Sequence, residues 1–550
     1  MKAYFKHLSK AAMMIVMLLM VTACGDDDND SPMPDSNTGQ TPTEMKKNLI
    51  GTWKSSTGSN TYEVYIFKTD GTAKYYNFTG STKNKEIDYA YTFDTSSMQI
   101  TLSSNDESKQ KKVSSITSDR LIMDGVTFLK VDNWNPEDPD NNNNGNNQQN
   151  GKRGPVATAF RGSGTEGDPY ILSDATELRK LADDVNSGMT YRDAFFKMTA
   201  DITINKNVLN ADGSLNGNGS NFEQWIPIGI DLEHVFCGTF DGNKHKISGL
   251  FIKKEESDTL GLFGVFSGHI KNLKIEDSYI EGKKNIGSVA GIATATKINN
   301  NYYGVTIENI VTSTTLVGGM HMGGIVGWLR AIDISGTPPD YFVSNCANKG
   351  LIFCDHNTVR IGGIIGCLYQ TSKHNKFFVS NCINYGDIKA ANSDGLGGVV
   401  GHISLGGSGS GEAHILNCAN FGNLSEPARS GGIVGMVGLE QYKILTIKNS
   451  VNYGMNSSNN NSGAIVGYLT TNGTKTINNN YYLETSCPRS VGAGGNWSTT
   501  NYNYSMTATQ MKAQSFLNTL NTNATTLGSE YGKWTFGSDG FPTLQWVLNF

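Results

Sequence analysis

A glycine-rich pentad that returns every 32 to 39 residues constrains the fold of this chain more than any other feature. A second phrase interleaves with the pentad, and its anchoring asparagine falls at Asn345, Asn381, Asn417 and Asn449, which are 36, 36 and 32 residues apart. Two phrases that share one period indicate a repeat architecture. The pentads read GSVAG at 287–291, GGIVG at 323–327, GGIIG at 362–366, GGVVG at 397–401, GGIVG at 431–435 and GAIVG at 463–467.

The local chemistry of each repeat predicts a parallel β-solenoid. Short β-branched and aromatic runs, such as 341–343 and 377–379, lie between Gly and Asn residues, and no apolar run has helical spacing. Glycine supplies positive φ and close backbone approach, and Asn tolerates left-handed geometry at turns. If one period closes one coil, coils stack about 4.8 Å apart. Asn345, Asn381 and Asn417 would then form an amide ladder, each side chain bonding the next. We therefore expect an all-β chain with a right-handed parallel β-helix over residues 161–490.

The repeats also resemble a known family. The pentads, together with the motifs FCGTFDGN at 236–243 and LGLFG at 260–264, look like GLUG repeats. Such repeats occur in large surface proteins of Bacteroidetes and in some IgA-specific metalloproteases. The resemblance covers roughly residues 160–490. It implies a fold and a cell-surface setting, and it says little about activity, because one fold serves many functions.

Composition limits the partners. A chain of 550 residues predicts more than one domain. Its 63 glycines and 17% charged residues fit a weakly charged β protein, and a net charge of −5 argues against nucleic acid as a partner. The odd set of cysteines left after Cys24 is interpreted as small buried side chains, with disulfides as the alternative in an exported protein. These are Cys237, Cys346, Cys354, Cys367, Cys382, Cys418 and Cys487.

The N-terminus predicts export and lipid anchoring. Residues 1–23 combine three lysines with an apolar run too short to span a bilayer, which is typical of a signal peptide. Small residues before Cys24 resemble a bacterial lipoprotein processing site, with Cys24 as the lipidated residue; an ordinary signal peptide is the alternative. The acidic run with Asp26, Asp27 and Asp28 resembles a surface-export signal of Bacteroidetes lipoproteins, or else is a solvated tether. We place the flexible tether at 24–44.

Residues 45–133 predict a small antiparallel barrel or meander. Alternating runs at 62–67, 87–93, 98–102 and 120–123 are separated by the turn signals Asp70-Gly71 and Asp124-Gly125. The Gly-Thr-Trp start at 51–53 and the hairpin at 67–71 resemble the lipocalin-like domains of Bacteroides lipoproteins. A filled core is favoured over an open ligand pocket. An Asn-rich linker is predicted at 134–160.

Helices are predicted to cover the solenoid. A capping-box pattern at Asp174 and Glu177 precedes apolar residues on one face, which predicts a short helix over the open end. Residues 491–550 leave the repeat and predict a C-terminal cap with a helix at 508–520 and a final aromatic strand.

No pattern in the sequence predicts catalysis. The metalloprotease motif H-E-x-x-H is absent from the sequence, the acids of the repeats do not recur in phase, and GxGxxG at 162–167 lacks the strand that a dinucleotide site needs. No cofactor, metal site or catalytic residue is therefore predicted. The expected function is binding or adhesion at the outer-membrane surface, to a glycan or to a host or bacterial surface protein. A carbohydrate-active enzyme, either a glycoside hydrolase or a lyase, is the alternative. The candidate ligand-binding residues are the aromatics Tyr385, Phe421, Tyr453 and Trp328. The first three share one phase of the repeat and are predicted to form a row, either an exposed contact stripe or a structural stack at the corners.

Overall fold

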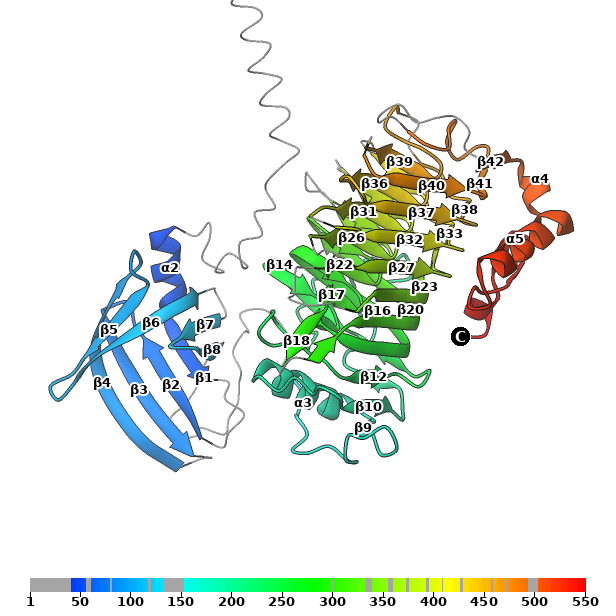
Figure 1. Ribbon diagram of the computed structural model, residues 1–550. Helices are drawn as coiled ribbons and strands as arrows, with labels where there is room; N and C mark the ends of the chain where they lie inside the picture. The colour runs from blue at the N-terminus through cyan, green and yellow to red at the C-terminus, as the bar shows by residue number, and fades with distance from the viewer. Residues whose placement is uncertain are drawn as a thin grey trace, which may run out of the picture. The chain divides into compact units, whose positions relative to one another are not determined.

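The computed structural model divides the chain into two compact units, one within residues 1–146 and the other within 147–550 (Figure 1). The predicted lipidation residue Cys24 and the acidic residues Asp26, Asp27 and Asp28 lie outside the residues that the structure describes. Those residues are 41–55, 61–79, 82–116, 120–131, 153–298, 301–331, 339–354, 360–371, 375–391, 395–407, 409–425, 429–456, 459–470, 472–492 and 503–550.

The first unit is a closed barrel of eight antiparallel strands in sequential order, which confirms the predicted antiparallel barrel. Trp53 is completely buried and donates its indole N–H to the carbonyl of Leu49 over 2.8 Å. Tyr65, Phe67 and other aromatic side chains fill the interior. The strands are β1 (Gly51–Ser55), β2 (Thr61–Phe67), β3 (Thr72–Thr79), β4 (Thr82–Asp94), β5 (Gln99–Ser103), β6 (Ser108–Ile116), β7 (Arg120–Met123) and β8 (Val126–Val131).

A helix that was not predicted precedes the barrel. Helix α2 (Pro42–Leu49) begins inside the stretch assigned to the tether. Thr41 and Glu44 form a reciprocal capping box, and Met45 and Leu49 are buried. The capping residues and Pro at the first helical position explain why the helix starts here.

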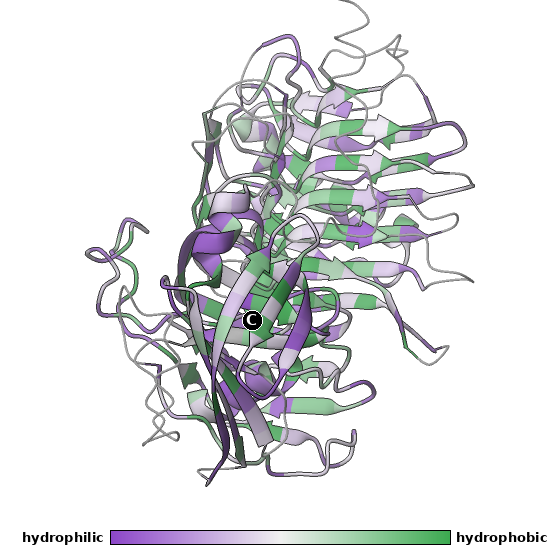
Figure 2. Ribbon diagram, turned by 90° about the vertical axis from the view of Figure 1, so that its left-hand side faces the viewer, coloured by the Kyte–Doolittle hydropathy of each residue, from purple (hydrophilic) through white to green (hydrophobic). Residues whose placement is uncertain are grey.

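The second unit stacks parallel strands coil on coil, the arrangement of a β-helix (Figure 1). Hydrophobic segments recur at the same position of successive coils in Figure 2, because the repeats stack in register. Along each strand, inward and outward side chains alternate. One wall is a seven-stranded parallel sheet. Its strands are β15 (Phe263–Phe266), β17 (Ala290–Thr294), β22 (Val326–Ala331), β26 (Ile365–Gln370), β31 (Val400–Leu405), β36 (Val434–Leu439) and β39 (Val466–Leu469).

The remaining walls belong to one continuous parallel sheet that follows the rest of each coil. A small antiparallel pair, β18 (Thr296–Ile298) and β19 (Asn301–Tyr303), lies beside the coils. The continuous sheet comprises β9 (Tyr170–Leu172), β10 (Phe195–Met198), β11 (Ile202–Thr203), β12 (Thr239–Asp241), β13 (Lys246–Ser248), β14 (Phe251–Leu260), β16 (Gly268–Gly287), β20 (Val305–Gly318), β21 (Met322–Gly323), β23 (Tyr341–Asn348), β24 (Ile352–Cys354), β25 (Arg360–Gly362), β27 (Lys376–Ser380), β28 (Ile383–Asn384), β29 (Ile388–Ala390), β30 (Gly395–Gly397), β32 (Glu412–Leu416), β33 (Ala419–Asn420), β34 (Leu424–Ser425), β35 (Ser430–Gly431), β37 (Ile444–Lys448), β38 (Val451–Asn452), β40 (Thr474–Asn478), β41 (Asn480–Leu483) and β42 (Asn503–Met506).

The repeated asparagines turn the corner of each coil. Asn345, Asn381, Asn417 and Asn449 all have φ between +50° and +57°, the left-handed region that Asn tolerates. Neighbouring side chains bond as predicted between Asn417 and Asn381 over 2.8 Å and between Asn449 and Asn417 over 2.7 Å. The predicted bond from Asn381 to Asn345 is wrong, because Asn381 donates instead to the carbonyl of Glu530 over 3.2 Å. The C-terminal segment therefore interrupts this outer amide ladder.

A second amide ladder inside the coils was not predicted. Asn348 donates to Asn384, Asn384 to Asn420 and Asn420 to Asn452, each over 2.8 to 2.9 Å, and all four side chains are completely buried. Each amide N–H also bonds the carbonyl of the glycine two residues further on, for example Asn420 to Gly422. The inner ladder thus satisfies buried polar groups coil by coil, as buried amides require.

The inner ladder explains why the two repeated phrases share one period. A Cβ added to Gly398 would lie 2.3 Å from Cγ of Asn420 and 2.1 Å from the carbonyl oxygen of Gly432. The pentad glycines therefore serve close approach of backbone and amide, whereas the positive φ at the corners belongs to Asn. The cysteines are free and buried, as interpreted, and Cys346, Cys382 and Cys418 lie one behind another in the same position of successive coils.

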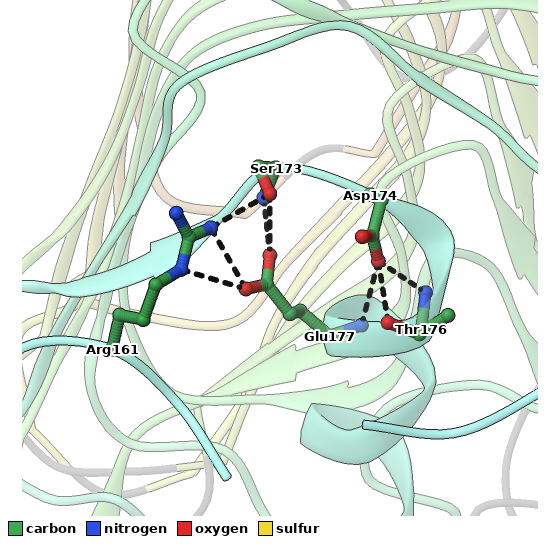
Figure 3. Close-up of polar contacts among 5 residues, drawn as sticks. All are labelled: Arg161, Ser173, Asp174, Thr176 and Glu177. Carbon is green, nitrogen blue, oxygen red and sulfur yellow. Dashed lines mark hydrogen bonds and ion pairs between the residues drawn. The ribbon is translucent and has the colours of Figure 1, made fainter. Parts of the chain in front are cut away.

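Helix α3 (Ala175–Asn186) covers the N-terminal end of the coils, as predicted (Figure 1). Leu178, Leu181, Ala182 and Val185 are completely buried in the solenoid core. Asp174 accepts from the backbone N–H groups of residues 176 and 177, the expected capping interaction. Glu177 does not complete the box at the cap residue, however, because its carboxylate accepts from Ser173 and from Arg161 over 2.9 Å (Figure 3).

The C-terminal segment lies along the side of the coils and not over their end (Figure 1). Its apolar side chains Phe516, Leu520 and Trp534 pack on Ile383, Val451 and other outward residues of β28, β33 and β38. The C-terminal segment therefore covers part of the solenoid, as a cap would, but it covers a side of the coils and not their end. The predicted helix divides into α4 (Ala508–Met511) and α5 (Gln514–Leu527), followed by the hairpin β43 (Trp534–Phe536) and β44 (Pro542–Leu544) and a 3₁₀ turn at Gln545–Leu548.

Candidate ligand-binding surfaces

The predicted aromatic row exists, but the chain covers it with its own C-terminal segment. The rings of Tyr385 and Phe421 stack 5.0 Å apart and those of Phe421 and Tyr453 4.4 Å apart. Tyr453 is only 7% exposed and donates to the carbonyl of Pro542 over 2.8 Å, while the Tyr385 hydroxyl lies 2.6 Å from that of Thr543. Of the two alternatives for this row, the structure therefore shows the structural stack and not the exposed stripe. A ligand at these rings would have to displace the segment.

Burial of the row also changes its chemistry. Loss of water around the hydroxyl raises the pKa of Tyr385 and, more strongly, that of Tyr453. Both hydroxyls stay neutral and act as hydrogen-bonding partners of the segment. In the described structure the row stabilises the C-terminal segment.

Trp328, the fourth predicted residue, lies on the seven-stranded sheet, apart from the row. It is half-buried, with the guanidinium carbon of Arg330 4.8 Å from its ring centroid. The rings of His321 and Tyr369 lie 5.1 and 5.9 Å away. Burial lowers the pKa of His321 well below its usual range, so this imidazole is neutral at physiological pH. The surroundings of Trp328 are thus an aromatic and guanidinium cluster packed on the sheet.

A third surface, which sequence reasoning missed, stays open. One outward residue from each of seven successive strand segments forms a column whose members are half-buried or exposed. Phe342, at 42% exposure, stacks on Phe378, and Phe378 stacks on His414, with centroids 5.2 and 4.9 Å apart. We call this the outer column: His269, Thr306, Phe342, Phe378, His414, Thr446 and Thr476.

The alternation of burial carried the missed signal. Tyr341 and Val343 point inward, as do Phe377 and Val379, so Phe342 and Phe378 must point outward. The runs were recognised as strands, but their middle aromatic residues were not assigned to the outside.

Charged groups beside the outer column occur in pairs. His269 Nε2 lies 2.8 Å from a carboxylate oxygen of Glu308. Glu412 contacts Lys376 over 3.0 Å and His414 over 2.9 Å. The hydrogen bond from His269 lowers the pKa of Glu308. Burial alone would raise the pKa of Glu412, but the bonds from Lys376 and His414 outweigh it and lower the pKa. Neither carboxyl is held protonated as a general acid would be at neutral pH.

Other features of the described residues indicate no further site. A recess of ≈ 190 Å³ lined by residues 216–222 is smaller than the roughly 300–1,000 Å³ of ordinary ligand pockets. Within the described ranges, no group of three His, Cys, Asp or Glu side chains is arranged to hold a metal ion. Nor does this part of the chain contain a helix long and apolar enough to cross a membrane.

Comparisons with known proteins give partial similarities. No protein-family model matches the chain. It is 32% identical over 170 residues to Halomucin of Haloquadratum walsbyi, covering 30% of this chain and 2% of that protein. It is 30% identical over 151 residues to a "Putative Gly-rich membrane protein" of Evansella cellulosilytica, covering 27% of this chain and 15% of that protein. The chain thus spans a small part of these curated relatives.

One solved structure gives a weak match. It is described as a putative immunoglobulin A1 protease from Bacteroides ovatus, with 20% identity and a TM-score of 0.43. The similarity covers 70% of this chain and 94% of that chain. At this level it carries no argument about activity.

Proposed function

We propose that this protein is a lipid-anchored binding or adhesion protein of the outer-membrane surface, whose solenoid presents a lateral face to a glycan or protein ligand. The observation that carries the proposal is the open outer column, on a solenoid whose N-terminal end is covered by α3 and whose neighbouring side is covered by the C-terminal segment. Repeat proteins use such extended lateral surfaces for binding.

Several finer features belong to the same proposal. The coil is right-handed, in line with the strong preference of parallel crossovers. The repeats are GLUG repeats of a Bacteroidetes surface protein, and the barrel is lipocalin-like. A surface setting agrees with the names of the two relatives, halomucin and a membrane protein. Binding without turnover is part of the proposal, and neither Glu308 nor Glu412 beside the outer column has the raised pKa that a general acid needs.

Anchoring is tested at Cys24. The C24A variant is expected to leave the membrane fraction and to lose labelling by a radioactive fatty acid, while keeping its β-sheet circular dichroism. A variant that stays membrane-bound and labelled would contradict the lipid anchor. In a separate variant, alanine at Asp26, Asp27 and Asp28 should keep the lipid but reduce cleavage by protease added to intact cells. Unchanged cleavage would refute surface export alone.

Binding is tested with the purified protein on a glycan array and a panel of immobilised host surface proteins. Retention on either is expected. Release of sugar or peptide products from any of these ligands would overturn the non-enzymatic proposal and favour the carbohydrate-active or proteolytic alternative.

A further inference from the structure

We propose that the outer column binds a neutral, extended polysaccharide that lies along the axis of the solenoid. The inference rests on the proposed binding function and names the face and the ligand class. The proposed binding face consists of the seven residues of the outer column and the outward residues beside them on the same strands.

The first argument is access. Phe342 is 42% exposed although both of its neighbours in β23 are buried. The apolar residues on the adjoining side of the coil, such as Ile383 and Val451, are instead sealed by the C-terminal segment. Within the described solenoid, the outer column therefore offers a stacked aromatic pair to solvent without any rearrangement.

The second argument is the geometry of the rings. Phe342 and Phe378 are nearly parallel, at 6°, and Phe378 and His414 lie at 11°. The rings cover one another's faces, so their edges point outward. Ring edges and the methyl groups of Thr306 and Thr446 form a narrow apolar line, and the threonine hydroxyls add donors and acceptors. A line of C–H groups flanked by hydroxyls suits the surface of a sugar chain, which also carries both kinds of group.

The third argument is the repeat. Equivalent residues of neighbouring strands stand about 4.8 Å apart, so seven of them span about 29 Å. A ligand that meets the same side-chain position at each step must itself repeat along the axis. Flanking hydroxyls follow the same register, since Ser344 lies beside Ser380 on the next strand. A polymer with regularly spaced hydroxyls fits this pattern, whereas a compact ligand would use only one or two steps.

The fourth argument is charge. The charges of this face alternate in sign, since Glu308 lies beside Lys271 on the neighbouring strand and Glu412 pairs with Lys376, so no single-sign field attracts a polyanion. Lys271 and Lys448 each lie two residues beyond the outer column on their own strand, and five strand steps, or about 24 Å, separate them. They are too distant to hold one acidic group together. The ligand class is therefore a neutral polysaccharide.

The test is native gel electrophoresis of the purified protein through gels that contain one polysaccharide each. Mannan and a soluble β-glucan are the neutral probes, and heparin and polygalacturonate are the acidic ones. Wild type is expected to be retarded by a neutral probe, and the F342S/F378S double variant should bind it at least tenfold more weakly. F353S is the matched control, because Phe353 is 40% exposed on β24, away from the column, and should behave as wild type.

Melting curves of each variant show whether it folds. If the double variant does not fold, T446R, which keeps the aromatic stack and places a long cation on the column, should also weaken retardation at least tenfold. Retardation by acidic probes alone, or equal effects of F353S and the column variants, would overturn the inference. If immobilised fibrinogen but no neutral polysaccharide retains wild type, the inference fails while the binding function stands. If nothing is retained, both fail.

Discussion

Replacing Asn420 by leucine tests the inner amide ladder, because this side chain is completely buried and bonded on both sides. Its Nδ2 donates to Oδ1 of Asn452 over 2.8 Å and to the carbonyl of Gly422 over 2.9 Å. Its Oδ1 accepts from Asn384 over 2.9 Å. Leucine fills a similar volume but offers none of these polar atoms.

The expected loss follows from the atoms left behind. N420L deprives Oδ1 of Asn452 and the Gly422 carbonyl of these donors, whereas Asn384 keeps its bond to the Gly386 carbonyl. One buried polar atom without a partner costs about 1–3 kcal/mol, so two give a loss of about 2–6 kcal/mol in the stability of this coil.

Hydrogen exchange measured by mass spectrometry on peptides from 384–452 reads this loss locally. A tenfold change corresponds to about 1.4 kcal/mol, so protection should fall roughly 30-fold or more where exchange requires the coil to open. The matched control is N518L, because Asn518 is exposed on α5 and its side chain accepts a hydrogen bond from exposed Gln514. Equal protection in N420L and N518L would refute a stabilising inner ladder.

Two further predictions concern the C-terminal segment and pH. Y453F leaves the buried carbonyl of Pro542 without its 2.8 Å donor, so it should cost about 1–3 kcal/mol and speed proteolytic release of the segment; Y442F, at a residue 73% exposed, should do neither. Because the folded pKa of Glu308 is depressed below 4.5, its contribution to stability is present above pH 4.5 and is lost as pH falls through the folded pKa. The melting temperature of wild type should therefore fall more steeply on acidification than that of E308Q, and parallel curves would contradict this role.

Repeat spacing predicted the corners, because each corner is a left-handed turn that favours Asn, and Asn recurs once per coil in the sequence. The inner ladder was not predicted, although Asn348 recurs as regularly as Asn345. Sequence shows that both positions repeat, but not which one points into the coil. In the barrel, β6 was not recognised because its first five residues, Ser108 to Lys112, are all polar and show no apolar alternation. Helix α2 was not recognised because its Thr and Pro residues are typical of a tether.

The candidate site could be predicted only in part, because its exposure depends on contacts between distant segments. The row containing Tyr385 and Tyr453 was recognised from its phase, and the rings do stack. Whether they face solvent is decided by residues 89 and 158 positions further along the chain. No local pattern encodes that docking. The outer column was missed for a different reason, because the alternation along the recognised strands was not followed to its outward residues.

The lateral C-terminal segment changes how the solenoid comes apart. The last coil of a stack has one neighbour only, so such proteins fray from the end inward, one coil at a time. Here Asn381, Asn417 and Asn449, on three successive coils, each bond the segment directly. Unfolding of the outermost of these three coils must therefore break its bond to a C-terminal segment that the other two coils still bind. We therefore expect these three coils to unfold together under load and not one at a time.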